Sequence, residues 1–165
     1  MHKGLSIHPT ATVSEFADIE ASVRGSRIVV GAYSMVDSFV KIKPAGGSGD
    51  VIIGKSSYIN SGTVIYSGEG ITIGDNVLIA ANCTLAPVNH AYKKRDTPII
   101  KQGFTPGKGG ITIEDDVWIG AGSVILDGAI LRKGCVVGAG SVVNHEIPEY
   151  SINVGSPAKL IGYRE

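Results

Sequence analysis

The chain has 165 residues, of which 43% are apolar, and it carries 15 basic and 15 acidic side chains. This length suits one domain with a hydrophobic core and is short for two. A formal net charge of zero provides no overall attraction to nucleic acid or to a membrane surface. The sequence has neither a signal-like apolar run near its start nor a stretch of about 18 apolar residues. We therefore expect one soluble, cytoplasmic domain spanning residues 1–165.

A repeat of six residues dominates the sequence. Twenty-three glycines accompany only three phenylalanines and one tryptophan, so regular stacking has to replace aromatic packing. Aliphatic residues recur at every sixth position in consecutive runs. These positions are Ile7, Val13, Ile19, Val30, Val36, Ile42, Ile53, Ile59, Ile65, Ile73, Ile79, Leu85, Ile113, Ile119, Ile125, Leu131, Val137 and Val143.

A second series lies four residues after the first. It consists of small or β-branched residues, namely Ala11, Ala17, Val23, Ser34, Val40, Ser57, Thr63, Val77, Cys83, Val117, Ser123, Ala129, Cys135 and Ser141, with exceptions at Gly46, Glu69, Asn89 and Ile147. The pattern predicts a triangular coil of three hexads per turn, with the large aliphatic inward and the small residue at the bend. About six coils would stack at the ordinary spacing of hydrogen-bonded strands, ~4.8 Å. Parallel crossovers are nearly always right-handed, so these physical rules alone favour a right-handed coil.

The repeat is interrupted once at length. Residues 91–112 are expected to form an extended loop, and residues 148–165 a C-terminal tail. Long loops inside compact domains usually carry function. This loop contains Lys93, Lys94, Arg95, Lys101 and Lys108 but only one acid, Asp96. We expect the cations either to be solvated or to meet an anionic substrate.

The repeat motifs resemble those of the bacterial hexapeptide acyltransferases. The resemblance covers nearly the whole chain and rests on residues 73–78 (IGDNVL), 79–84 (IAANCT), 117–124 (VWIGAGSV) and 137–143 (VGAGSVV). Residues 60–164 look most like the galactoside and maltose O-acetyltransferases and the related polysaccharide-modifying enzymes. The resemblance implies an all-β left-handed parallel β-helix, a homotrimer and the use of acetyl-CoA without a metal.

The same resemblance assigns a catalytic base and two acceptor-binding residues. His90 matches the general base, and imidazole is suited to removing a hydroxyl proton near neutral pH. Asn60 matches an acceptor-binding asparagine, and Trp118 matches a wall of the acceptor or pantetheine cleft. Gly68 stands where the galactoside enzymes have an acidic acceptor contact, so we expect a different acceptor.

Six further residues are assigned to the cofactor, five of them by their likeness to the family. The Ala121 amide matches a contact to the acyl thioester, and Ala139 matches a residue lining the CoA arm. Asn144, His145 and Lys159 match positions near the adenosine end. Lys159 and Arg164, in the C-terminal tail, are candidate phosphate partners, with a plain solvated cation as the alternative for either. The family often has Thr-Lys where this chain has Asn144 and His145, which weakens the assignment of these two residues.

Other functional classes fit the sequence less well. The γ-class carbonic anhydrases, which share the repeat, need three metal-binding histidines, but His2, His8, His90 and His145 lack their spacing. A scaffold or ice-binding prism would lack the long loop. Residues 103–110 do not have the P-loop spacing. Cys83 and Cys135 occupy inward positions, so we interpret them as core residues.

The sequence thus predicts an acetyl-CoA-dependent acetyltransferase that acts on a hydroxyl of a sugar or glycan precursor. N-acetylation of an amino sugar, of a nucleotide-linked amino sugar or of another small amine stays open, as does a non-enzymatic β-helical scaffold.

Overall fold

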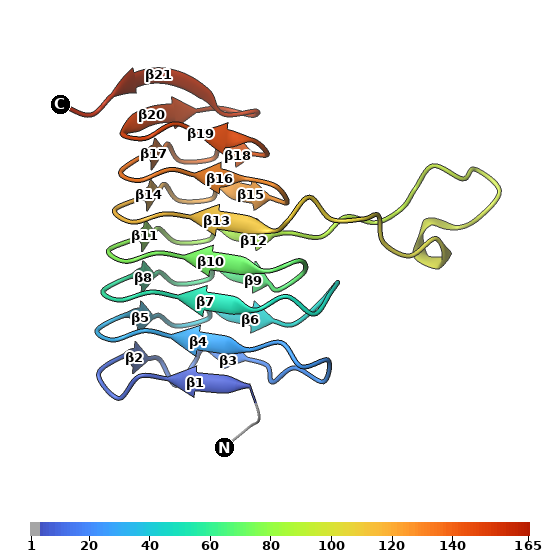
Figure 1. Ribbon diagram of the computed structural model, residues 1–165, viewed down its shortest axis with the longest axis horizontal. Coiled ribbons are helices and arrows are strands. Elements are labelled where there is room, and N and C mark those ends of the chain that lie inside the picture. The colour runs from blue at the N-terminus through green and yellow to red at the C-terminus, as the bar shows by residue number, and fades with distance from the viewer. Residues whose placement is uncertain (1–3) are drawn as a thin grey trace.

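The computed structural model describes residues 4–165 and is a left-handed parallel β-helix, seen in Figure 1 as a stack of triangular coils with one long loop projecting from it. Each coil contributes one short strand to each of three sheets, named here faces A, B and C. Face A contains β1 (Leu5–Ile7), β4 (Ile28–Val30), β7 (Val51–Ile53), β10 (Ile71–Ile73), β13 (Ile111–Ile113), β16 (Ile130–Leu131) and β19 (Glu146–Ile147).

Face B contains β2 (Thr12–Val13), β5 (Met35–Val36), β8 (Tyr58–Ile59), β11 (Leu78–Ile79), β14 (Trp118–Ile119), β17 (Val136–Val137), β20 (Ser151–Val154) and β21 (Lys159–Tyr163). Face C contains β3 (Asp18–Ile19), β6 (Lys41–Lys43), β9 (Val64–Tyr66), β12 (Thr84–Ala86), β15 (Val124–Leu126) and β18 (Val142–Val143). The corners between the faces are called A–B, B–C and C–A in chain order.

The six-residue register is confirmed by the strand pairing. Predicted inward residues stack on one another from coil to coil, as in the column Ile59, Ile79, Ile119 and Val137 of face B. All predicted inward positions from Val30 onward are buried. The first coil is more open, because it has a neighbouring coil on one side only, and Ile7 is 40% exposed.

From Ser34 onward, the small or β-branched residues at the bends are buried. Hydroxyl side chains are satisfied by carbonyl groups of the next coil: Ser34 Oγ donates to Gly54 O at 2.7 Å, and Ser57 Oγ donates to Gly74 O at 2.8 Å. A buried polar atom that is hydrogen-bonded in this way carries little penalty. Cys83 and Cys135 are buried as predicted, and burial raises the pKa of the Cys135 thiol to about 12.

The coil is left-handed, as the family resemblance implies, whereas the general crossover rule taken alone favours the opposite hand. The crossover rule reflects twisted strands feeding long connections, whereas these strands have two or three residues and turn through single residues with positive φ, such as Asn82 and Gly122. Two details of the residue pattern also differ from the prediction. Val23 is 97% exposed in the connection to the second coil. Ile147 is an inward residue of a partial seventh coil, stacked on Leu131.

The long loop begins and ends earlier than the predicted residues 91–112. It leaves the stack after β12 and returns at β13, so Thr112 already lies in a strand. In Figure 1 the yellow-green loop extends far beyond the prism from the C–A corner. The loop contains a short 3₁₀ helix, η1 (Ile99–Lys101), and no α-helix or strand.

Side chains at both ends hold the loop in shape. Gln102 Nε2 donates to the carbonyls of Lys94 and Thr97, and its Oε1 accepts the Lys94 N–H. At the base, the buried carboxylate of Asp127 accepts the N–H of Lys108 at 2.7 Å and that of Gly110 at 2.9 Å. The returning limb is therefore fixed to the coil above it.

The segment 148–165, expected to be a tail, adds two strands. β20 pairs parallel with β17 and continues face B, and β21 folds back antiparallel to β20. Within the described residues, no helix is long and apolar enough to cross a membrane.

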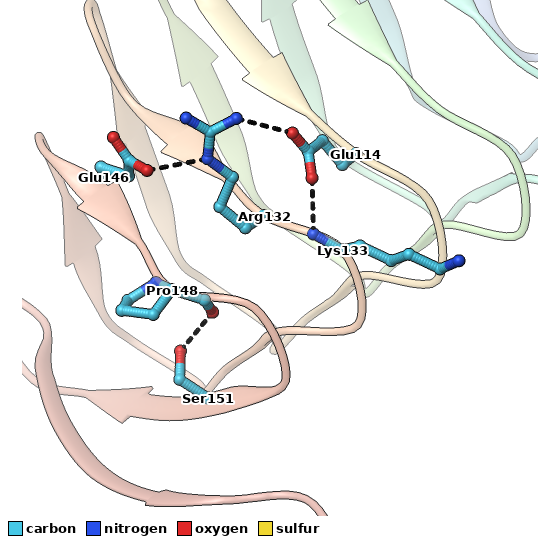
Figure 2. Close-up of polar contacts among 6 residues, drawn as sticks. All are labelled: Glu114, Arg132, Lys133, Glu146, Pro148 and Ser151. Carbon is cyan, nitrogen blue, oxygen red and sulfur yellow. Dashed lines mark hydrogen bonds and ion pairs between the residues drawn. The ribbon is translucent and has the colours of Figure 1, made fainter.

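Charged side chains on face A link successive coils. Figure 2 shows Arg132 between two carboxylates, donating to Glu114 Oε1 at 2.9 Å and to Glu146 Oε1 at 2.8 Å, while Glu114 Oε2 accepts the Lys133 N–H. The Arg132 guanidinium, and then the Lys133 N–H, lower the pKa of the Glu114 carboxyl.

Placing a carboxylate inside the stack should unfold it. Val137→Asp would bury an unpaired charge and lower the free energy of unfolding by several kcal/mol, about the cost of an unsatisfied buried polar group or more. The control is Val136→Asp, the preceding residue of β17, which faces outward. Thermal unfolding followed by circular dichroism checks this prediction, and equal midpoints for the two variants would contradict the register.

Arg132→Met should lower the unfolding temperature slightly at neutral pH. Because the pKa of the Glu114 carboxyl is lowered in the folded state, its ionised form stabilises the fold at pH values above its unfolded pKa of about 4.3. This stabilisation is lost as the pH falls through the folded-state pKa. The difference between variant and wild type should therefore shrink between about pH 5 and pH 3. A difference that stays constant across this range would assign the effect to packing of the arginine stem.

Asp127→Ala should release the returning limb while leaving the coils intact. The buried N–H of Gly110 and the part-buried N–H of Lys108 would lose their acceptor, and a buried donor left unsatisfied costs about 1–3 kcal/mol. Proteolysis within residues 87–110 should become faster, and Asp127→Asn, which keeps one acceptor oxygen, should be intermediate. Unchanged protection of the loop in both variants would refute the anchoring role.

Candidate functional site

His90 lies at the start of the long loop and lines its main hollow. It forms an isolated antiparallel bridge with Phe104, and the two rings lie 4.6 Å apart at 36°. The hollow has a volume of about 440 Å³ and is lined by Asn89, His90, Ala91, Tyr92, Lys93, Lys94, Gln102, Thr105 and Lys108. Because the His90 side chain is exposed, its ring is accessible to a small molecule bound there.

A row of small residues runs along the B–C corner in the upper coils. Ala121 and Ala139 are exposed and stack one coil apart, as predicted, since the Gly140 N–H donates to Ala121 O at 2.9 Å. Gly122 and Gly140 turn this corner with φ of 69° and 67°, and a Cβ at either position would meet no atom within 4 Å. The corner is open, and a thin chain could lie along it.

Two backbone donors at this corner have no partner within the chain. Among the hydrogen bonds of residues 4–165, none uses the N–H of Ala121 or that of Ala139. Both residues are exposed, which makes their N–H groups candidate donors to a carbonyl oxygen brought to the corner. Such donors are what a developing oxyanion needs.

Asn60 and Lys159 lie along the same corner as the two alanines. Asn60 precedes Ala80 and Gly120 in the column of corner residues, and its Nδ2 donates to Ile79 O at 2.7 Å. Lys159 pairs with Val154, whose side chain packs over Gly138. The structure therefore brings these four predicted residues together on one edge of the prism.

Asn144 and His145 lie elsewhere, at the C–A corner two coils above the loop. Their side chains contact each other, with His145 Nδ1 3.1 Å from Asn144 Oδ1. They share a corner with His90 but not with Ala121 and Ala139. Face C separates the two corners within one chain.

Trp118 and Arg164 occupy a third place. Trp118 is half exposed on face B, in a hollow of about 530 Å³ that also includes Leu78, Val136 and Arg164. Arg164 Nη1 donates to Asp116 Oδ2 and to Gly134 O, both at 2.9 Å, at the A–B corner. The guanidinium is thus engaged within the chain, away from the corner that carries Ala121 and Ala139.

Two residues with a part in the site were not identified from the sequence. Gln102 shapes the hollow and Asp127 anchors it, as described above. Asp127 carried a usable signal, because it stands two residues after the inward Ile125, where lower coils have Pro87 and Ser67. A carboxylate in that buried column needs donors, and the loop provides them. Gln102 has no such signal.

The described residues contain no group of three or more His, Cys, Asp or Glu side chains placed to hold a metal ion. One of the four histidines considered from the sequence, His2, lies outside these residues.

Comparisons with known proteins agree with the repeat. Residues 110–145 match the family described as "Bacterial transferase hexapeptide (six repeats)", and residues 50–87 match "Hexapeptide repeat of succinyl-transferase". The Mycobacterium tuberculosis protein named "Probable acetyltransferase Rv3034c" is 34% identical over 99% of this chain and 49% of its own length. Galactoside O-acetyltransferase of Escherichia coli is 37% identical over 68% of this chain and 53% of its own. The chain spans about half the length of these curated relatives.

A solved structure is similar over almost the whole chain. It is that of a point mutant of AntD, an N-acyltransferase from Bacillus cereus, in complex with dTDP-4-amino-4,6-dideoxyglucose and coenzyme A. The two superpose with a TM-score of 0.80 and 26% identity, covering 98% of this chain and 84% of AntD. With its six-residue repeat, left-handed coil and these similarities, the chain belongs to the bacterial hexapeptide-repeat acyltransferase family.

Proposed function

We propose that this protein transfers an acetyl group from acetyl-CoA to a hydroxyl of a sugar or glycan precursor, with His90 as general base. The observation that carries the proposal is the open B–C corner, where Ala121 and Ala139 are exposed and their N–H groups have no partner within the described residues. A pantetheine arm is thin enough to lie along such a corner. The similarity to galactoside O-acetyltransferase supports the hydroxyl acceptor.

The reaction is a direct transfer within a ternary complex. A ring nitrogen of His90 takes the proton of the acceptor hydroxyl as its oxygen attacks the thioester carbonyl. The Ala121 N–H donates to the oxyanion of the tetrahedral intermediate. Collapse of the intermediate forms the ester and expels the CoA thiolate, which takes the proton from the imidazolium. Holding both substrates together provides the remaining acceleration.

In this proposal a complete site needs two copies of the chain. Within one chain, His90 leaves the C–A corner while Ala121 lies at the B–C corner, on the opposite edge of face C. The loop extends away from its own prism (Figure 1). In a trimer it could therefore place His90 beside the B–C corner of a neighbouring chain. We propose a homotrimer with three such shared sites. A wild-type monomer in sedimentation at micromolar concentration, still fully active, would refute this arrangement.

N-acylation of an amino sugar, free or nucleotide-linked, is the second candidate. The similarity to AntD, whose structure contains an amino sugar linked to dTDP, favours it. The proposed geometry serves either reaction, because His90 can remove a proton from an attacking amine as well as from a hydroxyl. A screen of CoA release over hydroxyl and amino sugars, free and nucleotide-linked, separates the two candidates. A protein that binds no CoA would instead be a scaffold.

His90→Ala should lower turnover by about two to four orders of magnitude, which is the usual contribution of a general base. Affinity for CoA should change little, since His90 lies away from the B–C corner proposed to hold CoA. His8→Ala, which removes another exposed histidine in the first coil, is the matched control and should keep near-normal turnover. Wild-type kcat in His90→Ala would disprove the mechanism.

A further inference from the structure

The hollow around His90 carries an uncompensated positive charge. Of the five cations in the loop, three line this hollow, namely Lys93, Lys94 and Lys108, whereas Arg95 and Lys101 do not. No acidic residue lines it. Within the described residues, no carboxylate comes within 4.0 Å of these lysine amines, although the face A and face C cations are paired. Cations around one cavity repel each other unless an anion occupies it.

Hydrogen bonds within the chain hold both limbs of the loop around the hollow. Gln102 ties the limb that carries Lys94 through three hydrogen bonds. The Ala91 N–H donates to Gly103 O at 2.9 Å, and the Thr105 N–H donates to Asn89 O at 2.9 Å. The outgoing and returning limbs of the loop are therefore hydrogen-bonded to each other beside His90. Asp127 fixes the backbone of Lys108 to the stack. A site held in this way loses little entropy when a ligand binds.

The size and lining of the hollow suit a phosphorylated small molecule. Its volume of about 440 Å³ falls in the usual range for small-molecule sites, roughly 300–1,000 Å³. Tyr92 is 67% exposed at its edge and offers a face for a base or sugar ring. Lysine amines bind phosphate as point charges with several donors.

From these observations we infer that Lys93, Lys94 and Lys108 form a phosphate-binding subsite that holds a diphosphate or phosphate monoester group next to His90. The inference deepens the proposed function and depends on it for the role of His90. Two sources have this chemistry, the phosphates of CoA and a diphosphate-linked acceptor. In the second case the bound diphosphate positions the acceptor, so that its reacting hydroxyl or amine lies beside His90. The sugar then contacts Asn89 and Thr105.

A charge-matched pair of variants tests the subsite. Lys93→Gln/Lys94→Gln removes two cations that line the hollow, and Arg95→Gln/Lys101→Gln removes two cations of the same loop that do not. Binding of inorganic pyrophosphate, dTDP, CoA and dephospho-CoA is measured by calorimetry at low and high salt. We expect the first pair to weaken binding of pyrophosphate and of one organic ligand about tenfold and to flatten the salt dependence. The second pair should change either affinity less than about twofold.

The four probes identify the source of the phosphate. Loss of dTDP affinity with CoA affinity kept assigns the subsite to a nucleotide-linked acceptor, and the reverse assigns it to CoA. Equal effects of the two variants on pyrophosphate binding, or no effect of either, would overturn the subsite. His90-dependent CoA release without a lysine effect would leave the proposed function standing and remove the subsite. Lysine-dependent pyrophosphate binding without any CoA release would leave the subsite standing and refute the proposed function.

Discussion

Every feature of this protein depends on one constraint, the requirement that each coil hydrogen-bond and pack on the coil below in the same register. Strands of two or three residues have no stability of their own, and only stacking makes them persist. A column such as Ile59, Ile79, Ile119 and Val137 is therefore both the core and the device that sets the register. An insertion is tolerated only where it leaves from a corner and returns to the same corner.

The same constraint explains where chemistry can be placed. Corners that repeat without insertion form straight edges, and at the B–C corner Ala121 and Ala139 leave the edge open. The single long insertion at the C–A corner carries His90 and the lysines of the hollow. The stack thus presents an open backbone edge, and the loop provides titratable and cationic side chains.

The sequence predicted the stack well because its signal is repeated in every coil. The inward positions that the spacing identified are all buried from Val30 onward, with Ile147 missed in the partial seventh coil. The same spacing placed Ala121 and Ala139 at one corner. The handedness was not accessible, since it depends on corner residues with positive φ such as Asn82 rather than on the aliphatic period. The internal structure of the loop was not accessible either. The bonds of Gln102 join residues without any periodic relation, and the engagement of Arg164 with Asp116 required a chain reversal that spacing does not encode.

The reversed strand β21 has a consequence for the solubility of the stack. An exposed parallel rung is a template on which another chain can add, and such edges promote fibre-like growth. Here β20 is covered by an antiparallel partner, and the edge of β18 is occupied because the Ala158 N–H donates to Val142 O while Gly155 O accepts the Val142 N–H. Two of the three uppermost edges are thereby closed to further parallel addition. β21 and residues 155–158 thus cap the stack on these two faces and hinder end-to-end association of prisms through them.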